Sequence, residues 1–541
     1  MFTEEEKKLL KKYVTSVEDD VFAIKDMGGM VGAAYARYSR AKGGFREVLL
    51  KEFIKEGIID PKHADELIER ILVAYGDDSV GELEGAHISF ENISMLATKE
   101  IEERRIGGSP IEQSTRYVFY DQKNDRGEWR YLRDESLTSA PFGKKYIETM
   151  DFIFETYASL VEPMKQYFEK LKPLNSAEYD INGDGQKEKY SDLTDAKDQK
   201  AFRTTYGFDL RSKACDTIRC LLPLSTLTNV GMFGNGRFYQ GVISHMLTSD
   251  IPEVAKIAEK ALKAAGEVIP QYVRRAKRSE YQAGVKKNMF ELAKKLFGSI
   301  RPEIPDTLPA VALAEATSTD TATVAAMLFP FTNLSLTTLR AKIEKFSEST
   351  KTEIIKTYIG DRKTRRDRPG RALEDGYPYT FGLVTNWSVY KDLMRHRMNT
   401  QQRQLFTTQI GFEIPEEIKL AGFETKVLEC INKTNGLYEQ IAGANPVLAQ
   451  YAVLHGHFVR WSLGMNDREA MHLTELRSTP QGHPQYRRIA QKIHELITAR
   501  SPWRGEAMKF VDYNDYYWSR ADSEARQRVK EKKLDEKYKP R

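Results

Sequence analysis

Two arginine-rich segments of the chain contain the residue types that bind anions. The first, Arg104–Tyr117, reads RRIGGSPIEQSTRY. Its two glycines and its proline keep the backbone irregular, so that main-chain amides can point toward a ligand. The hydroxyl of Ser114 and the guanidinium of Arg116 suit a phosphate, whereas Glu112 would contact an imide, a ribose hydroxyl or an arginine. The segment is therefore either an anion site or a surface loop with an arginine–glutamate pair.

The second segment, Arg395–Thr408, reads RHRMNTQQRQLFTT and belongs to a wider internal repeat. Each arginine cluster is followed along the chain by an Asn-x-Arg tripeptide, Asn235–Arg237 in the first half and Asn466–Arg468 in the second. The spacing is about 130 residues in the first half and about 70 in the second, and a polar insertion at Leu174–Lys200 explains roughly half of the difference. A duplicated domain whose copies have diverged is the simplest account of this order.

The elements that must position these segments are mostly helical. Apolar residues recur at three- and four-residue spacing in Val254–Val273 and Ile489–Ile497, which predicts helices, and the β-rich run Tyr377–Val384 predicts a strand. We therefore expect an α+β protein, rich in helices, with two tandem domains that each contain a β-sheet. The expected divisions are a first domain at 1–296 with an insertion at 174–200, a linker at 297–309, a second domain at 310–518 and a charged tail at 519–541.

The composition suits a folded cytoplasmic protein. Of the 541 residues 40% are hydrophobic, and a net charge of +5 tolerates anionic small molecules without demanding nucleic acid. The basic run at 362–371 lacks interleaved aromatic residues, so we do not expect a nucleic-acid partner. The cysteines Cys215, Cys220 and Cys430 fit neither a disulfide framework nor a zinc pattern. No apolar run is long enough to cross a membrane, so no membrane association is expected.

The order of these residues resembles the signature of the flavin-dependent thymidylate synthases, R-H-R-x-x-S-x-N-E-x-S-x-R-Y. The second copy keeps the opening Arg395, His396 and Arg397 but loses the later part of the signature. The first copy keeps six of the nine fixed positions, namely Arg104, Ser109, Glu112, Ser114, Arg116 and Tyr117. Within the signature, only the asparagine is missing from both copies.

Later landmarks of the family also occur in both halves. Arg219–Pro223 (RCLLP) resembles the family's A-R-x-V-L-P element, and Met246 stands where the first half would carry a final arginine. In the second half, Leu476-Arg477 lies at the family's spacing, with Arg477 eleven residues after Asn466. The tripeptides HPQ and SPW near the end are similar to the family's H-A-Q and C-P-W. The resemblance therefore covers nearly the whole chain as two diverged copies.

The resemblance implies that each copy supplies one wall of the active site. The implied substrate-binding residues, all in the first copy, are Glu112, Gln113, Ser114, Arg116 and Arg219. The implied flavin-binding residues are Arg395, His396, Arg397, Asn466 and His472, and the implied catalytic residues are Arg477 and Arg395. Because members of the family are homotetramers with sites between subunits, two tandem chains are expected to form a homodimer, a pseudo-tetramer of four domains.

The activity that the resemblance implies is methylation of C5 of deoxyuridine monophosphate. Methylenetetrahydrofolate gives the carbon, and FAD that NADPH has reduced gives the hydride. Arg477 would stabilise negative charge on the ring oxygens so that C5 becomes nucleophilic, and no cysteine nucleophile is needed. The family's upstream Glu-His pair is replaced by Glu84-Gly85 and Asp375-Gly376, which leaves a different pyrimidine open as the substrate. A non-catalytic tandem fold that binds nucleotides or a partner is the competing interpretation.

A separate polar loop matches the start of a calcium-binding pattern. Asp180, Asn182 and Asp184 place oxygen ligands at positions one, three and five, and Gly185 stands at position six. Position twelve is Ser191 rather than a glutamate, so the bidentate carboxylate is missing or shifted. The loop is therefore either a calcium site or a flexible polar loop.

Overall fold

The computed structural model describes most of the chain, in two compact units. The described residues are 2–25, 27, 31–38, 44–55, 58–59, 81–297, 302–316, 319–332, 334–365, 367, 369–374, 378–518, 525, 529, 533–534 and 537–538. The first unit comprises Met1–Gln113, Leu132–Ser136 and Thr226–Ile300, and the second comprises Ser114–Tyr131, Leu137–Ser225 and Arg301–Arg541. A large part of the first sequence copy thus packs with the second copy.

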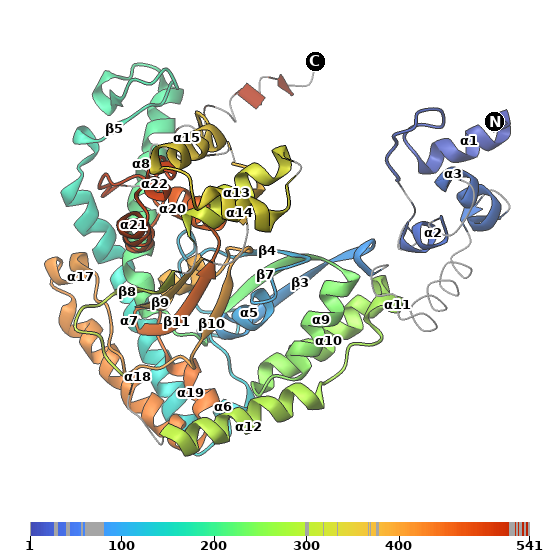
Figure 1. The fold of residues 1–541 in the computed structure, drawn as a ribbon. Coiled ribbons are helices and arrows are strands. Elements are labelled where there is room, and N and C mark those ends of the chain that lie inside the picture. The colour runs from blue at the N-terminus through green and yellow to red at the C-terminus, as the bar shows by residue number, and fades with distance from the viewer. Residues whose placement is uncertain are drawn as a thin grey trace. The chain divides into compact units, whose positions relative to one another are not determined.

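The first unit is built around a three-stranded antiparallel sheet with the strand order β3-β7-β4 (Figure 1). β3 (Gly85–Ser94) and β4 (Gly108–Glu112) flank β7 (Leu227–Asn235), in which every second residue is buried. Alternating burial is typical of a strand with one face on a core. The other elements are α1 (Glu4–Tyr13), α2 (Val31–Tyr38), α3 (Phe45–Val48), the π-helical turn Leu49–Phe53, β1 (Ile54–Lys55), β2 (Ile58–Ile59), α5 (Met95–Glu102), α9 (Gly236–Leu247), α10 (Pro252–Val268), α11 (Pro270–Val273) and α12 (Glu280–Phe297).

The second unit contains a four-stranded antiparallel sheet with the order β10-β11-β9-β8. Its strands are β8 (Ala310–Ala316), β9 (Tyr379–Asn386), β10 (Thr400–Arg403) and β11 (Phe458–Met465). Its helices are α7 (Gly143–Leu171), α8 (Ala196–Ile218), α13 (Asp320–Leu328), α14 (Leu336–Ile343), α15 (Glu348–Ile359), α16 (Trp387–Leu393), α17 (Glu416–Leu420), α18 (Glu424–Ala444), α19 (Pro446–Ala449), α20 (Asp467–Arg477), α21 (Pro484–Arg500) and α22 (Pro502–Ala507). A hairpin of β5 (Glu178–Tyr179) and β6 (Glu188–Lys189) lies between α7 and α8, and α6 (Glu135–Thr138) has residues in both units.

The two sheets repeat one topology, which confirms the α+β fold and the tandem copies. In each sheet the strand that comes last in the sequence, β7 or β11, lies between the two strands that it pairs with. The order β3-β7-β4 in the first sheet therefore corresponds to β9-β11-β10 in the second. The first strand of each set leads into a capped helix, with the Ser94 side chain accepting from the Ala97 amide and the Asn386 side chain accepting from the Val389 amide. Such caps satisfy amides that would otherwise lack partners at the start of a helix.

The structure confirms the elements that were expected from periodicity. Residues 254–273 form α10 and α11, and Ile489–Ile497 lies inside α21. The strand expected at 377–384 is β9, which begins at Tyr379. The polar insertion is largely the β5–β6 hairpin with short flanking 3₁₀ turns, and α8 begins before it ends.

Parts of three expected segments lie outside the described residues. These are Asp375-Gly376, positions 298–301 of the linker and most of the tail after Trp518. Among the helices that the structure describes, none combines the length and the apolar character that crossing a lipid bilayer requires.

Candidate active site

The strand-to-helix junction between β11 and α20 positions most of the candidate side chains. Asn466 caps α20, because its Oδ1 accepts a hydrogen bond from the Glu469 amide at 2.8 Å. Its Nδ2 donates to the carbonyl of Glu374 at 3.2 Å. Arg477 lies in the last turn of the same helix. One helix therefore carries candidate residues at both of its ends.

A cavity of about 600 Å³ opens along this helix. It is lined by the five expected flavin-binding residues and the two expected catalytic residues, with Arg395 belonging to both sets. The complete lining is Glu374, Arg395, His396, Arg397, Met398, Asn466, Arg468, Glu469, His472, Leu476 and Arg477. Four guanidinium groups thus face a single cavity, which suits an anionic ligand.

His396 forms a buried hydrogen-bonded array in the wall of this cavity. The Nε of Arg477 donates to His396 Nε2 at 2.8 Å. Nδ1 must then carry the imidazole proton, and it lies 2.6 Å from Oε1 of the buried Glu469. Burial and the nearby Arg477 charge hold the pKa of His396 well below its ordinary value, so the ring is neutral. The array fixes both the tautomer of His396 and the direction of Arg477.

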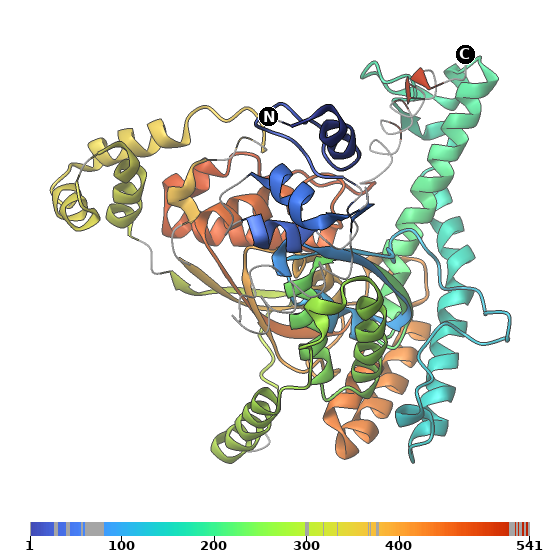
Figure 2. The same ribbon diagram turned by 90° about the vertical axis from the view of Figure 1, so that its right-hand side faces the viewer.

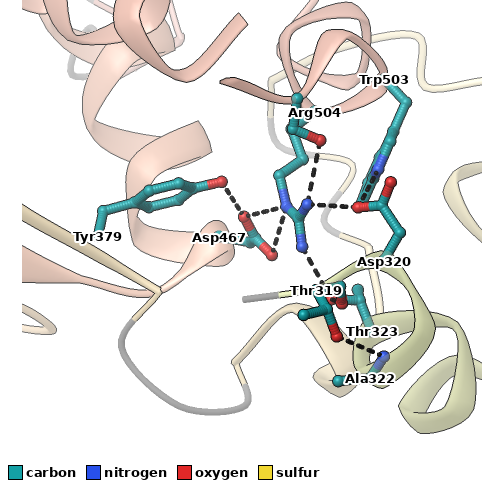
Figure 3. Close-up of polar contacts among 9 residues, drawn as sticks. Thr319, Asp320, Ala322, Thr323, Tyr379, Asp467, Trp503 and Arg504 are labelled. Atoms are coloured by element: carbon teal, nitrogen blue, oxygen red, sulfur yellow. Dashed lines mark hydrogen bonds and ion pairs between the residues drawn. The ribbon is translucent and has the colours of Figure 1, made fainter. Parts of the chain in front are cut away.

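Ion pairs of the buried Arg504 hold the start of α20 in place (Figure 3). Arg504 donates through Nε to Asp467 at 3.0 Å and through Nη1 to Asp320 at 2.8 Å. The hydroxyl of Tyr379 donates to the same Asp467 carboxylate at 2.6 Å. Because Asp467 follows the capping Asn466, these bonds fix the helix end that borders the cavity.

A second buried pair holds the far end of the helix. Arg362 donates through Nη1 and Nη2 to the two oxygens of Glu475, at 2.7 and 2.6 Å. Only 4% of Arg362 is exposed. This member of the basic run at 362–371 is therefore structural.

Arg116 and Arg219 of the first copy lie in the second unit, near this helix. Arg116 donates to both oxygens of Asp216, from Nε at 2.7 Å and from Nη2 at 2.6 Å, and from Nη1 to the Gln481 carbonyl at 3.4 Å. Burial raises the pKa of Asp216, but the Arg116 charge and this bidentate contact more than offset it and hold the pKa below its ordinary value. Arg116 is therefore oriented by the protein itself.

Asp392 is the point at which arginines from both copies converge. Burial raises its pKa, but the charges of Arg219, Arg395, Arg116 and Arg477 hold that pKa below the ordinary value. Arg219 Nη2 lies 3.6 Å from Asp392 Oδ2. Both atoms are buried, and neither has a hydrogen-bond partner among the described residues. The centre of the cluster thus holds an ion pair whose two facing atoms lack hydrogen-bond partners among the described residues.

The remaining expected substrate residues are divided between the units. Ser114 lies in the second unit, where its Oγ accepts from the Arg116 amide at 3.2 Å. Glu112 and Gln113 belong to the first unit. There Glu112 accepts from the buried Lys99 at 3.1 Å, and Gln113 accepts from Asn229 at 3.3 Å.

Three carboxylates of the site were not identified from the sequence. Asp216 and Asp392 each stand three residues before a candidate arginine, Arg219 and Arg395 respectively. Glu469 follows the capping Asn466 by three residues, at a helix position where a carboxylate is common. An Asp-x-x-Arg pattern in both copies was the available signal, but the family signature contains no such carboxylate.

The polar loop at 180–185 has a closed hydrogen-bond pattern of its own. Asp180 accepts from the amides of Gly183 at 2.6 Å and Gly185 at 3.2 Å, and both glycines have positive φ. Asn182 Nδ2 donates to Glu188 at 2.6 Å. Asp184 accepts from the Gln186 amide at 2.9 Å. These contacts stabilise the loop as it stands, and calcium binding stays a prediction.

Comparison with known proteins agrees with the repeat. A model of the family described as thymidylate synthase complementing protein matches residues 28–271 and again 312–503. A UPF0159 protein of Chlamydia pneumoniae is 36% identical, covering 97% of this chain and 98% of its own length. A UPF0159 protein of Chlamydia muridarum is 34% identical (98% and 99% covered), and one of Thermoplasma acidophilum is 31% identical (92% and 98% covered).

Proposed function

Because the chain belongs to the thymidylate synthase complementing protein family, we propose that it is an FAD-dependent enzyme that methylates C5 of deoxyuridine monophosphate. Methylenetetrahydrofolate would supply the carbon and NADPH the reducing equivalents. The active site would combine Arg116 and Arg219 of the first copy with Arg395 and Arg477 of the second. We further infer that two chains associate, so that four domains form the working enzyme.

The convergence of arginines from both copies on Asp392 is the observation that carries this proposal. Four guanidinium groups and three carboxylates, those of Asp216, Asp392 and Glu469, leave a net charge of +1. The nearby His396 and His483 are neutral, because burial holds the pKa of each well below its ordinary value. A phosphate monoester carries about −1.5 to −2 at neutral pH, so a nucleoside monophosphate complements this charge.

The unused polar atoms at the centre of the cluster support a ligand that both accepts and donates. Arg219 Nη2 needs an acceptor, and Asp392 Oδ2 needs a donor within a few ångströms of it. The imide edge of uracil places a carbonyl oxygen beside an N–H, and a sugar hydroxyl offers both functions in one atom. A pyrimidine nucleotide therefore supplies the missing partners, whereas an anion without a hydrogen atom, such as sulfate, supplies only the acceptor.

The residues that would activate the pyrimidine are already oriented. Arg477 Nε is held by neutral His396, which leaves the terminal nitrogens of Arg477 for negative charge on a ring oxygen. Glu469 holds the imidazole proton on Nδ1, so His396 keeps an acceptor directed at Arg477. Because these groups are already in place, the site has to rearrange little when negative charge develops on the pyrimidine ring.

The cavity on α20 suits the flavin cofactor. Arg395, Arg397 and Arg468 offer charge to a diphosphate, and Asn466 and His472 offer polar contacts from the helix. Bound FAD would supply the hydride, and the protein would position it against the pyrimidine. The buried cysteines agree with chemistry that needs no thiolate, since burial raises the pKa of Cys430 to about 11.

The proposal is tested with the purified full-length chain. We expect the visible absorption of bound flavin, its bleaching by NADPH, and thymidylate formation only when deoxyuridine monophosphate and methylenetetrahydrofolate are both present. A parallel reaction with deoxycytidine monophosphate distinguishes a different pyrimidine substrate. A chain that takes up no added FAD and forms no product would contradict the proposal and favour a nucleotide-binding protein without catalysis.

A further inference from the structure

Three side chains of types that bind metal ions meet between two helices of the first unit. Glu100 belongs to α5, and Glu103 is the C-cap of the same helix, three residues later, so both lie on one side of it. His245 belongs to the last turn of α9. One ligand atom from each of the three residues lies within 4.8 Å of the other two. Two carboxylates and one imidazole from separate helices thus share one small space.

The two helices that carry these side chains are firmly placed. α5 and α9, blue and green in Figure 2, pack against each other and against the central strand β7. The side chains of Ser94 and Asn235 cap the two helices, and every residue of α5 is buried. Side chains on such rigid elements hold their separation well, as a preformed metal site requires.

His245 distinguishes this cluster from a simple group of acidic residues. Its Nε2 is buried and has no hydrogen-bond partner among the residues that the structure describes. It lies 3.4 Å from Oε2 of Glu100, whereas the hydrogen-bonded His396 and Glu469 approach to 2.6 Å. Two ligands that are each about 2.0–2.1 Å from a tetrahedral zinc ion lie about 3.3–3.4 Å apart. The observed separation therefore matches two ligands of one ion better than a hydrogen-bonded pair.

The donor set selects the class of ion. Two carboxylates carry a charge of −2 that a divalent cation neutralises, and Glu100 is only 9% exposed, which makes a nearby cation favourable. Mg²⁺ and Ca²⁺ prefer oxygen ligands, whereas an imidazole favours zinc and its transition-metal neighbours. The guanidinium of Arg104 lies beside Gly241, one turn before His245 on α9, and its charge should keep the affinity moderate.

His245 has a different residue type at its counterpart in the second copy. It stands ten residues after the capping Asn235, and ten residues after the capping Asn466 stands Leu476, which lines the cavity on α20. The same turn of the repeated helix therefore carries an apolar side chain in one copy and a potential metal ligand in the other. This ligand cannot be explained as a remnant of the candidate flavin residues.

We propose that Glu100, Glu103 and His245 bind one Zn²⁺ ion in the first unit. The ion joins α5 to α9, and a water molecule completes its tetrahedral coordination. The proposal does not depend on the flavin chemistry, because none of the three ligands is a candidate flavin or substrate residue.

The test is a zinc titration of the full-length chain, without an affinity tag and after a chelator has removed any bound metal. Isothermal titration calorimetry should show one Zn²⁺ per chain with a dissociation constant in the micromolar range. His245→Ala and Glu103→Gln should each weaken binding by at least about 100-fold, because losing a ligand costs more than losing a residue that only supports one. His87→Ala is the matched control, since this exposed histidine lies on β3 of the same unit and outside the cluster.

Cobalt(II) provides a second measurement at the same site. Tetrahedral cobalt(II) absorbs visible light far more strongly than the hydrated ion, so the wild-type and His87→Ala chains should turn blue and the His245→Ala chain should not. Circular dichroism of every variant checks that the chain remains folded. A wild-type chain that binds no stoichiometric zinc, zinc binding to His245→Ala as tight as to the control, or equal affinity of the wild-type chain for Mg²⁺ and Zn²⁺ would overturn the proposal.

Discussion

The strand-to-helix junctions of the two copies have the same backbone but different side-chain chemistry. In the first copy β7 leads into α9, and in the second β11 leads into α20. Asn235 and Asn466 cap these helices in the same way, each accepting from an amide three residues on at 2.8 Å. Eleven residues after the cap, however, the first copy has the fully buried Met246, and the second has Arg477 at the cavity.

Both copies keep the same scaffold, whereas the arginines of the cluster around Asp392 are divided between them. Central strands and caps are maintained because each backbone amide needs a partner, whatever the helix carries on its surface. The arginines were under no such constraint, and each copy kept only some of them. The described cluster around Asp392 contains Arg116 and Arg219 of the first copy and Arg395 and Arg477 of the second, so neither copy supplies all four arginines.

The largest expected effect comes from removing the arginine that only the second copy retains. Arg477→Ala should lower kcat for thymidylate formation by about 100- to 1,000-fold, as removal of a group that stabilises developing charge typically does. Arg237→Ala in the first-copy helix is the control, because Arg237 is exposed and paired with Glu82. Equal losses in the two variants, measured by single-turnover product formation, would contradict the division of chemistry between the copies.

Restoring the arginine in the first copy should damage the fold instead of creating a second site. Met246→Arg places a charge in the core of the first unit and should cost more than about 3 kcal/mol of unfolding free energy. Met246→Leu is the volume-matched control and should cost less than about 1.5 kcal/mol. Urea unfolding measures both, and a stable Met246→Arg chain would mean that the two helices are still interchangeable.

The buried carboxylate behind His396 should control how tightly the second-copy cavity holds its ligand. Glu469→Ala removes the partner of His396 Nδ1 and should raise the dissociation constant for FAD about tenfold, through the loss of one charged hydrogen bond. Glu469→Gln keeps an acceptor oxygen and should recover part of that affinity. Flavin fluorescence titration measures both, and identical affinities in the two variants would show that Glu469 has only a packing role.

Mild acid should loosen the second unit around β11 and α20. Burial lowers the pKa of His396, His457 and His483, that of His457 to about 3, whereas an unfolded chain binds these protons near pH 6.5. Stability is therefore full above about pH 6.5 and falls below it by up to about 1.4 kcal/mol per pH unit for each histidine. Hydrogen exchange at pH 7.5 and 5.5 should show faster opening of β11, and unchanged protection there would contradict the neutral, buried state of these rings.

Replacing the cysteines should have the smallest effect on activity of all these substitutions. Cys215→Ala, Cys220→Ala and Cys430→Ala remove buried thiols, of which Cys215 and Cys220 adjoin Asp216 and Arg219 in the chain but are not candidate site residues. Each variant should keep activity within about twofold of wild type and lose about 1 kcal/mol of stability or slightly more. A loss of activity as large as that of Arg477→Ala would indicate a thiol nucleophile and a different mechanism.

The order of motifs was sufficient to predict the duplicated α+β fold and six of the eleven residues that line the cavity on α20. The motif asparagines could be recognised in the sequence because asparagine is a preferred capping residue where a helix begins. Asp216, Asp392 and Glu469 were not predicted, since a carboxylate near an arginine in sequence is usually a solvated ion pair. The packing of residues 114–131 and 137–225 with the second copy could not be predicted either. A repeat in the sequence does not show which segments lie close in space.

The central claim is that one chain brings Arg116 and Arg477 into the same site, and mixed dimers test it directly. Chains with Arg116→Ala and chains with Arg477→Ala are co-expressed with different tags, and the mixed dimer is purified through both tags. The account predicts no more thymidylate formation than in either parent, because each chain's site has lost one arginine. Recovery to about half of wild-type activity would contradict it, since that result requires sites formed between chains.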